Sequence, residues 1–86
     1  MPYVSLFFGI LIRMFHNEHN PPHFHAEYQG QRGLFDFNGN MIKGSFKSKT
    51  ALKLIKEWAL LHRDELNANW LKAAEGKPID KINPLD

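Results

Sequence analysis

The stretch that decides the fold is "SKTALKLIKEWALLHRDELNANWLKAAEG", residues 48–76. Ser48 is a typical helix N-cap, and Gly76 followed by Pro78 is a typical helix end. At about 100° per residue, one side of this helix carries Leu52, Ile55, Trp58, Ala59, His62, Leu66, Trp70 and Ala73, and the other carries Lys53, Lys56, Glu57, Arg63, Asp64 and Asn67. Unbroken, the helix would be about 42 Å long. That exceeds the width of so small a domain, so we expect a bend or break near Asp64–Asn67.

The first half of the chain predicts an antiparallel sheet. From Val4 to Met14 every even position is apolar, which predicts that Val4–His16 is a strand with one buried face. Gly9 within it indicates a bulge or a close backbone approach. A second strand is expected at His23–Tyr28, closed by the turn signal Gln29-Gly30.

A hairpin is predicted in the middle of the chain. Leu34–Phe37 and Met41–Phe46 flank Asn38-Gly39, the dipeptide that best tolerates a type I′ turn. Pro78–Leu85 is expected to run along the surface as a short extended segment, such as an edge strand. The predicted fold class is therefore α+β: a small antiparallel sheet of three to four strands, packed against one long or bent C-terminal helix.

Composition indicates a single globular domain over residues 1–86, with 43% hydrophobic residues. The chain contains no cysteine, which excludes disulfides and thiolate metal ligands. The apolar stretch Val4–Phe15 is interrupted by Arg13 and is shorter than the roughly 20 residues of a membrane span. We therefore expect a cytoplasmic protein without a membrane segment.

Four of the five histidines lie in "HNEHNPPHFHA", residues 16–26. Side chains alternate along a strand, so His23, His25 and Glu27 are expected on one face, and Phe24, Ala26 and Tyr28 on the other. Two imidazoles in an H-x-H pair can bind one metal ion. In the metal hypothesis the ligands come from His16, His19, His23, His25 and Glu27. The bound metal would be a divalent ion such as zinc. The alternatives are acid–base chemistry without a cofactor, or an exposed strand face with no ligand.

His62 falls within the apolar side of the helix, where an aliphatic residue would be expected. Glu65 and Asn69 lie close to the same line. Buried polar groups need partners, so His62 either bonds to Glu65 or the backbone, or joins His23 or His25 in a cleft between helix and sheet. In such a cleft a carboxylate partner would suit imidazole for proton transfer.

Lysines gather around the predicted start of the helix, at Lys43, Lys47, Lys49, Lys53 and Lys56. Cations at a helix N-terminus oppose the helix dipole, and free backbone N–H groups there can hold a phosphate. One interpretation is a phosphate or nucleic-acid contact by Lys47, Lys49, Lys53 and Lys56. The other is a solvated lysine face that binds nothing.

Three stretches resemble a family of short bacterial proteins known as domain-of-unknown-function family 4160. They are "FFGILIRMFHNEHNPPHFHAEY" (7–28), "ALKLIKEWALLHRDELNANW" (51–70) and "GKPIDKINPL" (76–85), and P-P-H-F-H-A is the most specific part. The chain departs from the family at Phe46-Lys47-Ser48-Lys49, where such proteins have Leu-Pro and arginines. The resemblance implies a small partner protein in a toxin–antitoxin-like pair and a nucleic-acid target. It assigns no catalytic residue.

Three functions follow as hypotheses. The first is a module of a toxin–antitoxin-like system that binds a partner protein and nucleic acid, with metal-independent RNA cleavage by His23, His25 or His62 as acid and base. In it, Arg63 or Lys49 would neutralise a phosphate. The second is a metal-binding protein that uses the histidine cluster. The third is a structural interaction domain whose histidines only support the fold.

Overall fold

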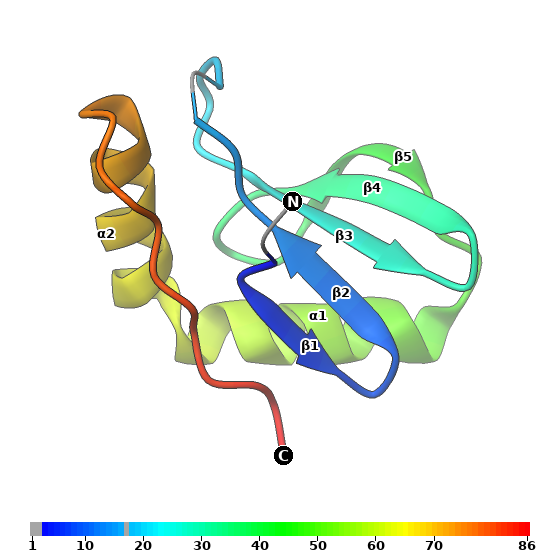
Figure 1. Cartoon of the computed structure of the whole chain (residues 1–86). Coiled ribbons are helices and arrows are strands. Elements are labelled where there is room, and N and C mark those ends of the chain that lie inside the picture. The colour runs from blue at the N-terminus through cyan, green and yellow to red at the C-terminus, as the bar shows by residue number, and fades with distance from the viewer. Residues whose placement is uncertain (1–2, 17) are drawn as a thin grey trace.

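The described residues, 3–16 and 18–86 of this computed structural model, form five strands and two helices (Figure 1). The strands are β1 (Ser5–Phe7), β2 (Ile10–Arg13), β3 (Phe24–Tyr28), β4 (Gln31–Phe35) and β5 (Met41–Ser45), and the helices are α1 (Lys49–Leu61) and α2 (Arg63–Ala74). The sheet is antiparallel, in the order β1-β2-β3-β4-β5. Helix α1 crosses one face, and α2 stands at the end where the β2–β3 loop projects (Figure 1). The α+β prediction is confirmed, with more strands than expected.

The predicted strand Val4–His16 is in fact two strands, β1 and β2. Phe8 and Gly9 have φ angles of 49° and 79° and form a tight turn, so Phe7 pairs with Ile10. Before the turn the odd positions face the core, and after it the even positions do. Leu6 and Phe8 are therefore exposed. A run that is apolar at most positions gives no alternation by which to place such a turn. Gly9 therefore serves a turn rather than a bulge.

The two later hairpins close differently. Gln29 and Gly30, with φ angles of 47° and 79°, join β3 to β4 as a tight turn of the expected kind. The type I′ prediction at Asn38-Gly39 is wrong, because Asn38 does not have a positive φ angle. Instead, a carboxylate oxygen of Asp36 accepts hydrogen bonds from the backbone N–H groups of Asn38 and Asn40, at 2.9 and 3.0 Å. The side chain of Asp36 thus shapes this loop.

Aromatic side chains join α1 to the sheet. Trp58 is fully buried, and its ring centroid lies 5.4 Å from that of Phe7 and 5.5 Å from that of Phe24. Phe24 in turn stacks on Phe35 at 5.6 Å. The indole Nε1–H of Trp58 donates to the carbonyl of Asn83 at 2.9 Å. Trp58 therefore ties the sheet, α1 and the C-terminal segment together, and the core lies between α1 and the sheet.

The helical region is broken at His62, two residues before the predicted stretch Asp64–Asn67. His62 ends α1 and precedes α2, with φ −120° and ψ 28°. An unbroken helix of about 42 Å would not fit a molecule whose greatest extent is 34 Å. One long helix is thus replaced by two. Neither helix within the described ranges has the length and apolar character needed to cross a bilayer.

The segment after α2 is extended but is not a strand. Its Ile82 N–H donates to the carbonyl of Val4 at 2.9 Å, beside β1. Asn69 of α2 is buried and makes two hydrogen bonds with the backbone of Asp80, at 2.8 and 3.1 Å. Asn69, one of the three polar residues expected to face inward, therefore holds the C-terminal segment.

The loop at Gly39 requires glycine for two reasons. Its φ angle is +83°, and a Cβ atom there would lie 2.5 Å from the Cα of Lys56. We expect Gly39→Ala to lower the free energy of unfolding by about 3 kcal/mol, the sum of a left-handed backbone and overpacking. Gly30→Ala is the control, because φ there is +79° with open space around the new atom, and it should cost about 1 kcal/mol. Denaturant titration measures both, and equal losses would contradict the close packing at Gly39.

Removal of the Asn69 side chain should release the C-terminal segment. We expect Asn69→Ala to lower the free energy of unfolding by about 2 kcal/mol, because the backbone of Asp80 loses both partners. Limited proteolysis should then cut residues 78–86 faster. Asn67→Ala, at an exposed position of the same helix, should change stability by less than about 0.5 kcal/mol. Similar results for the two variants would show that Asn69 does not anchor the segment.

Candidate functional site

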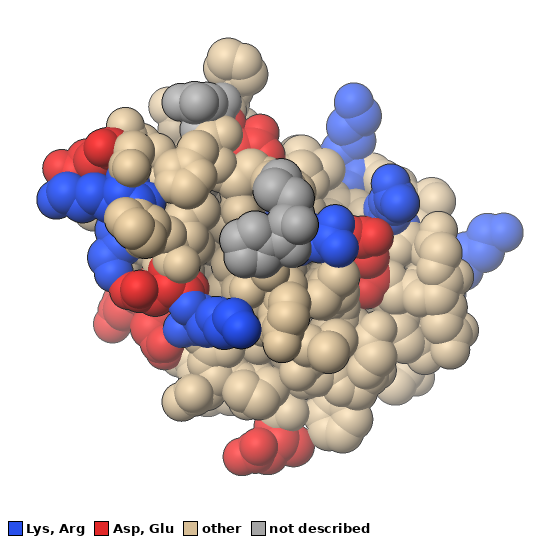
Figure 2. Space-filling model, in the orientation of Figure 1, with Lys and Arg blue, Asp and Glu red and all other residues tan. Residues whose placement is uncertain are grey.

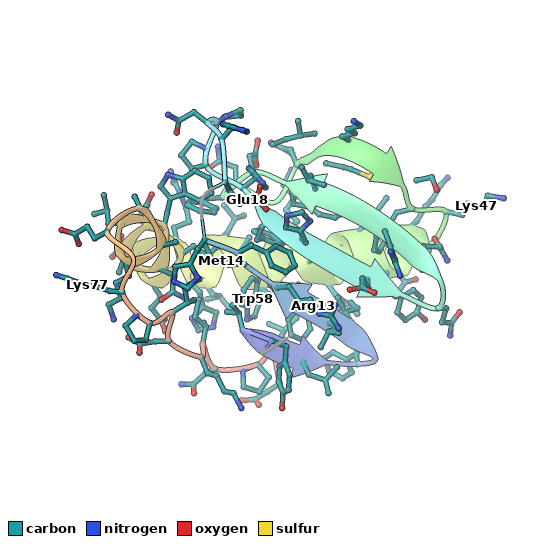
Figure 3. The ribbon with its side chains drawn as sticks, turned by 45° about the horizontal axis from the view of Figure 1, so that its top comes forward. Arg13, Met14, Glu18, Lys47, Trp58 and Lys77 are labelled. Atoms are coloured by element: carbon teal, nitrogen blue, oxygen red, sulfur yellow. The ribbon has the colours of Figure 1, made fainter. Side chains whose placement is uncertain are left out.

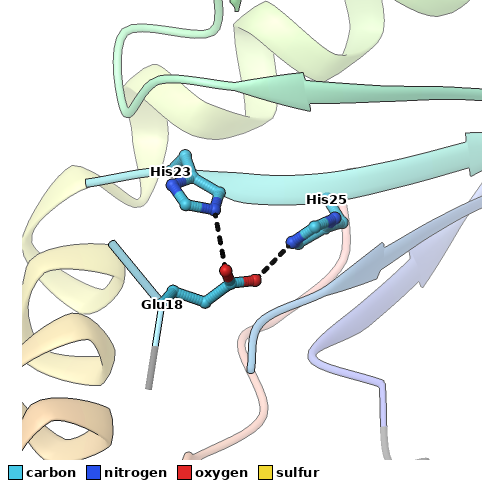
Figure 4. Close-up of side chains that lie close together, drawn as sticks. All are labelled: Glu18, His23 and His25. Carbon is cyan, nitrogen blue, oxygen red and sulfur yellow. Dashed lines mark hydrogen bonds and ion pairs between the residues drawn. The ribbon is translucent and has the colours of Figure 1, made fainter. Parts of the chain in front are cut away.

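His23 and His25 point away from α1, because they alternate with Phe24. Phe24 is fully buried against Trp58 of α1, which directs its two neighbours to the outer side of the sheet. His23 is 7% exposed, and the side chain of His25 is 28% exposed. The two rings lie on the same side as predicted, 5.3 Å apart between centroids, although His23 stands one residue before β3 begins. Figure 4 shows both rings turned toward the same carboxylate.

That carboxylate belongs to Glu18, in the loop between β2 and β3 (Figure 4). Its Oε1 lies 2.6 Å from Nε2 of His25, and its Oε2 lies 3.6 Å from Nε2 of His23. One oxygen of Glu18 and one ring nitrogen from each histidine all lie within 4.8 Å of one another. We call these three residues the Glu18–His23–His25 cluster.

The orientation of His23 is set by a backbone contact. Its Nδ1 lies 2.8 Å from the carbonyl oxygen of Pro21, and because a carbonyl only accepts, Nδ1 carries the hydrogen. In the neutral ring, Nε2 then has a free lone pair. That atom is buried and has no hydrogen-bond partner among the described residues. The separation of 3.6 Å from Glu18 is too long for a hydrogen bond.

Aromatic side chains surround the cluster. The ring of His23 lies 5.3 Å from that of Trp70 of α2, and His25 meets the ring of Phe15 edge to face at 4.7 Å. Phe15, Glu18 and Trp70 also line a hollow of about 130 Å³ between the loop and α2. The cluster is therefore partly shielded from water, which strengthens electrostatic interactions within it.

The other expected metal ligands lie elsewhere. Glu27 forms ion pairs with Arg13 at 3.2 Å and Arg32 at 3.5 Å, so it is not the carboxylate of the cluster. His16 is exposed and bonds through Nε2 to the carbonyl of Lys77 at 2.8 Å. His19 is also exposed, and neither histidine is part of the cluster.

His62 does not join the two histidines of the sheet, and the expected helix–sheet cleft is wrong. Its Nδ1 lies 2.6 Å from Oε1 of Glu65, and its ring lies 5.6 Å from that of Trp58. The reason is that α1 covers the face opposite to that of His23 and His25. The contact with Glu65 was the other expectation and is confirmed. Arg63 is exposed on the first turn of α2.

The lysines of the helix start lie apart from the cluster. Lys47, Lys49, Lys53 and Lys56 are all exposed, and Ser48 caps α1 as expected by accepting from Ala51 N–H at 3.1 Å. Figure 3 places Lys47 at the opposite end of the sheet from Glu18. On the face in Figure 2, basic and acidic side chains are interspersed. The cluster and the lysines are therefore two separate features.

Sequence reasoning missed Glu18, Arg13 and Trp70. Glu18 lies inside the quoted histidine motif, five residues before His23, but the loop conformation that turns it back toward β3 has no periodic signal. Trp70 was placed on the apolar side of the helix and does pack, half-buried, against the core, but its position beside His23 was not foreseen.

One family model matches the chain, over residues 9–71, and its description is "Domain of unknown function (DUF4160)". The match spans well over half of the chain and includes Glu18, His23, His25, α1 and most of α2. No curated protein and no solved structure shows significant similarity. The chain therefore belongs to the family described as a domain of unknown function, DUF4160.

Proposed function

We propose that the Glu18–His23–His25 cluster binds a divalent transition-metal ion, such as Zn²⁺, and is the functional centre of the protein. The observation that carries this proposal is Nε2 of His23, a buried ring nitrogen without a hydrogen-bond partner among the described residues, held near a carboxylate. In the neutral ring an electron pair faces a negative charge in a shielded place, which is unfavourable unless a proton or a metal cation lies between them.

The donor set suits such an ion. Two neutral imidazoles and one carboxylate are the protein ligands of many zinc and iron sites, and three protein ligands leave a coordination position open. The hydrogen bond from His23 to the Pro21 carbonyl is the outer contact that fixes the ring of a metal ligand. With bonds of 2.0–2.1 Å, ligand atoms in a tetrahedral site are separated by about 3.3 Å. Glu18 reaches this arrangement by withdrawing slightly from His25, which its position in a loop permits.

The wider role of this site is proposed from the family resemblance. The protein would act in the cytoplasm as one member of a toxin–antitoxin-like pair, bound to a small partner protein. The exposed lysines at the start of α1 would provide contacts to nucleic acid, because their charges lack acidic neighbours in the first turn of the helix.

Metal binding is tested on protein purified without a histidine tag. We expect one Zn²⁺ per chain by elemental analysis, and excess Zn²⁺ should stabilise the protein by about 2.7 kcal/mol at 100 times Kd. His23→Ala should abolish both effects, and Glu18→Gln should weaken binding at least tenfold, as loss of even an outer contact costs about 10–100-fold.

His19→Ala is the matched control, because His19 is an exposed histidine of the same loop outside the cluster. It should retain full metal content. Equal zinc in the wild type and His23→Ala, or none in either, would rule out the site.

Metal-independent RNA cleavage is the second candidate, and one observation favours it. The contact of 2.6 Å between His25 and Glu18 is a histidine–carboxylate pair of the kind that supports proton transfer. If this candidate is correct, single-stranded RNA should be cleaved in the presence of EDTA, and His25→Ala should lower the rate at least 100-fold. His62→Ala should retain the activity, because His62 lies outside the cluster. No cleavage in EDTA by the wild type would remove this candidate.

A further inference from the structure

The outer face of the sheet beside His25 carries an excess of basic side chains. Arg13 of β2 is paired directly with His25, and Arg32 of β4 is paired directly with Glu27. Paired residues in an antiparallel sheet point to the same side, so all four share the face of the Glu18–His23–His25 cluster. Lys43 of β5 pairs with Leu34, which itself pairs with His25, and Lys43 therefore faces the same way.

A hollow of about 350 Å³ lies on this face, and its lining includes Arg13, His25, Glu27 and Arg32. Its size is at the lower end of the range of small-molecule sites, about 300–1,000 Å³. His25 belongs both to the cluster and to the wall of this hollow. A ligand bound in the hollow would therefore lie next to the proposed metal ion.

The charges in the hollow do not balance. Among the described residues that line it, Glu27 is the one carboxylate, and it makes a single ion pair with each arginine, at 3.2 and 3.5 Å. A guanidinium has five N–H donors, and each ion pair with Glu27 engages a single nitrogen of its arginine. Nε of Arg13 is buried without a hydrogen-bond partner in the described part of the chain, and the side chain of Arg32 is 81% exposed.

We propose that this hollow is a subsite for a phosphate group, free or as the ester of a nucleotide, held by Arg13 and Arg32 beside the metal ion. The inference rests on the proposed metal site and names the class of ligand that would complete it. A divalent ion bound by one carboxylate and two neutral rings keeps a net positive charge and attracts an anion to its open position. The planar fork of arginine matches the oxygens of a phosphate.

The tests are titrations of inorganic phosphate and of uridine monophosphate into zinc-loaded protein, followed by calorimetry. We expect Arg13→Gln and Arg32→Gln each to weaken phosphate binding at least about tenfold, as loss of a charged hydrogen bond does, with unchanged zinc content. Lys77→Gln is the control, because Lys77 is exposed beyond α2 and does not line the hollow, and it should leave phosphate binding unchanged. Arg32 is exposed, so its variant should fold even if Arg13→Gln does not.

The two ligands distinguish the source of the phosphate. Tighter binding of uridine monophosphate assigns a nucleotide ester, and tighter binding of inorganic phosphate assigns the free ion. Phosphate binding that is unaffected in the Arg13→Gln/Arg32→Gln double variant would overturn the subsite. In another outcome, the wild type binds phosphate but no zinc, while the arginine variants lose phosphate binding. That result would rule out the metal site and support the anion subsite.

Discussion

The packing of Phe24 on Trp58 is the contact on which the arrangement of the molecule depends. Phe24 lies in β3, the central strand, and its burial against α1 decides which face of the sheet is covered. Because side chains alternate, the same contact turns His23 and His25 outward. A shift of one residue in β3 would bury two imidazoles in an apolar core, where they would lack partners. The core thus determines the position of the candidate site without contributing a residue to it.

The features that were predictable from the sequence are those with local causes. The common side of the H-x-H pair at the start of β3 follows from alternation, and the cap at Ser48 follows from side-chain chemistry. The turn at Gln29-Gly30 is likewise a property of its own residues. The division between β1 and β2 was not predictable, because Val4–Met14 is apolar almost throughout and its turn begins at a phenylalanine, not at a residue typical of turns.

The rest of the candidate site depends on contacts between segments that are distant in the sequence. Glu27 and Glu18 were equally available as the carboxylate, and the choice follows from the two arginines on neighbouring strands that pair with Glu27. The break at His62 places Trp70 beside His23, and a straight helix would have carried Trp70 away from the sheet. Periodicity within one segment contains no information on either point.

Strand β5 is the last of the sheet and is exposed at all five residues, with Met41 and Ile42 among them. Its outer backbone groups offer a template on which a strand from another molecule can add. Lys43 stands at the centre of this template, and an incoming strand would have to pass its ammonium group and bring a carboxylate to compensate it. This charge makes fibrous self-association through β5 costly.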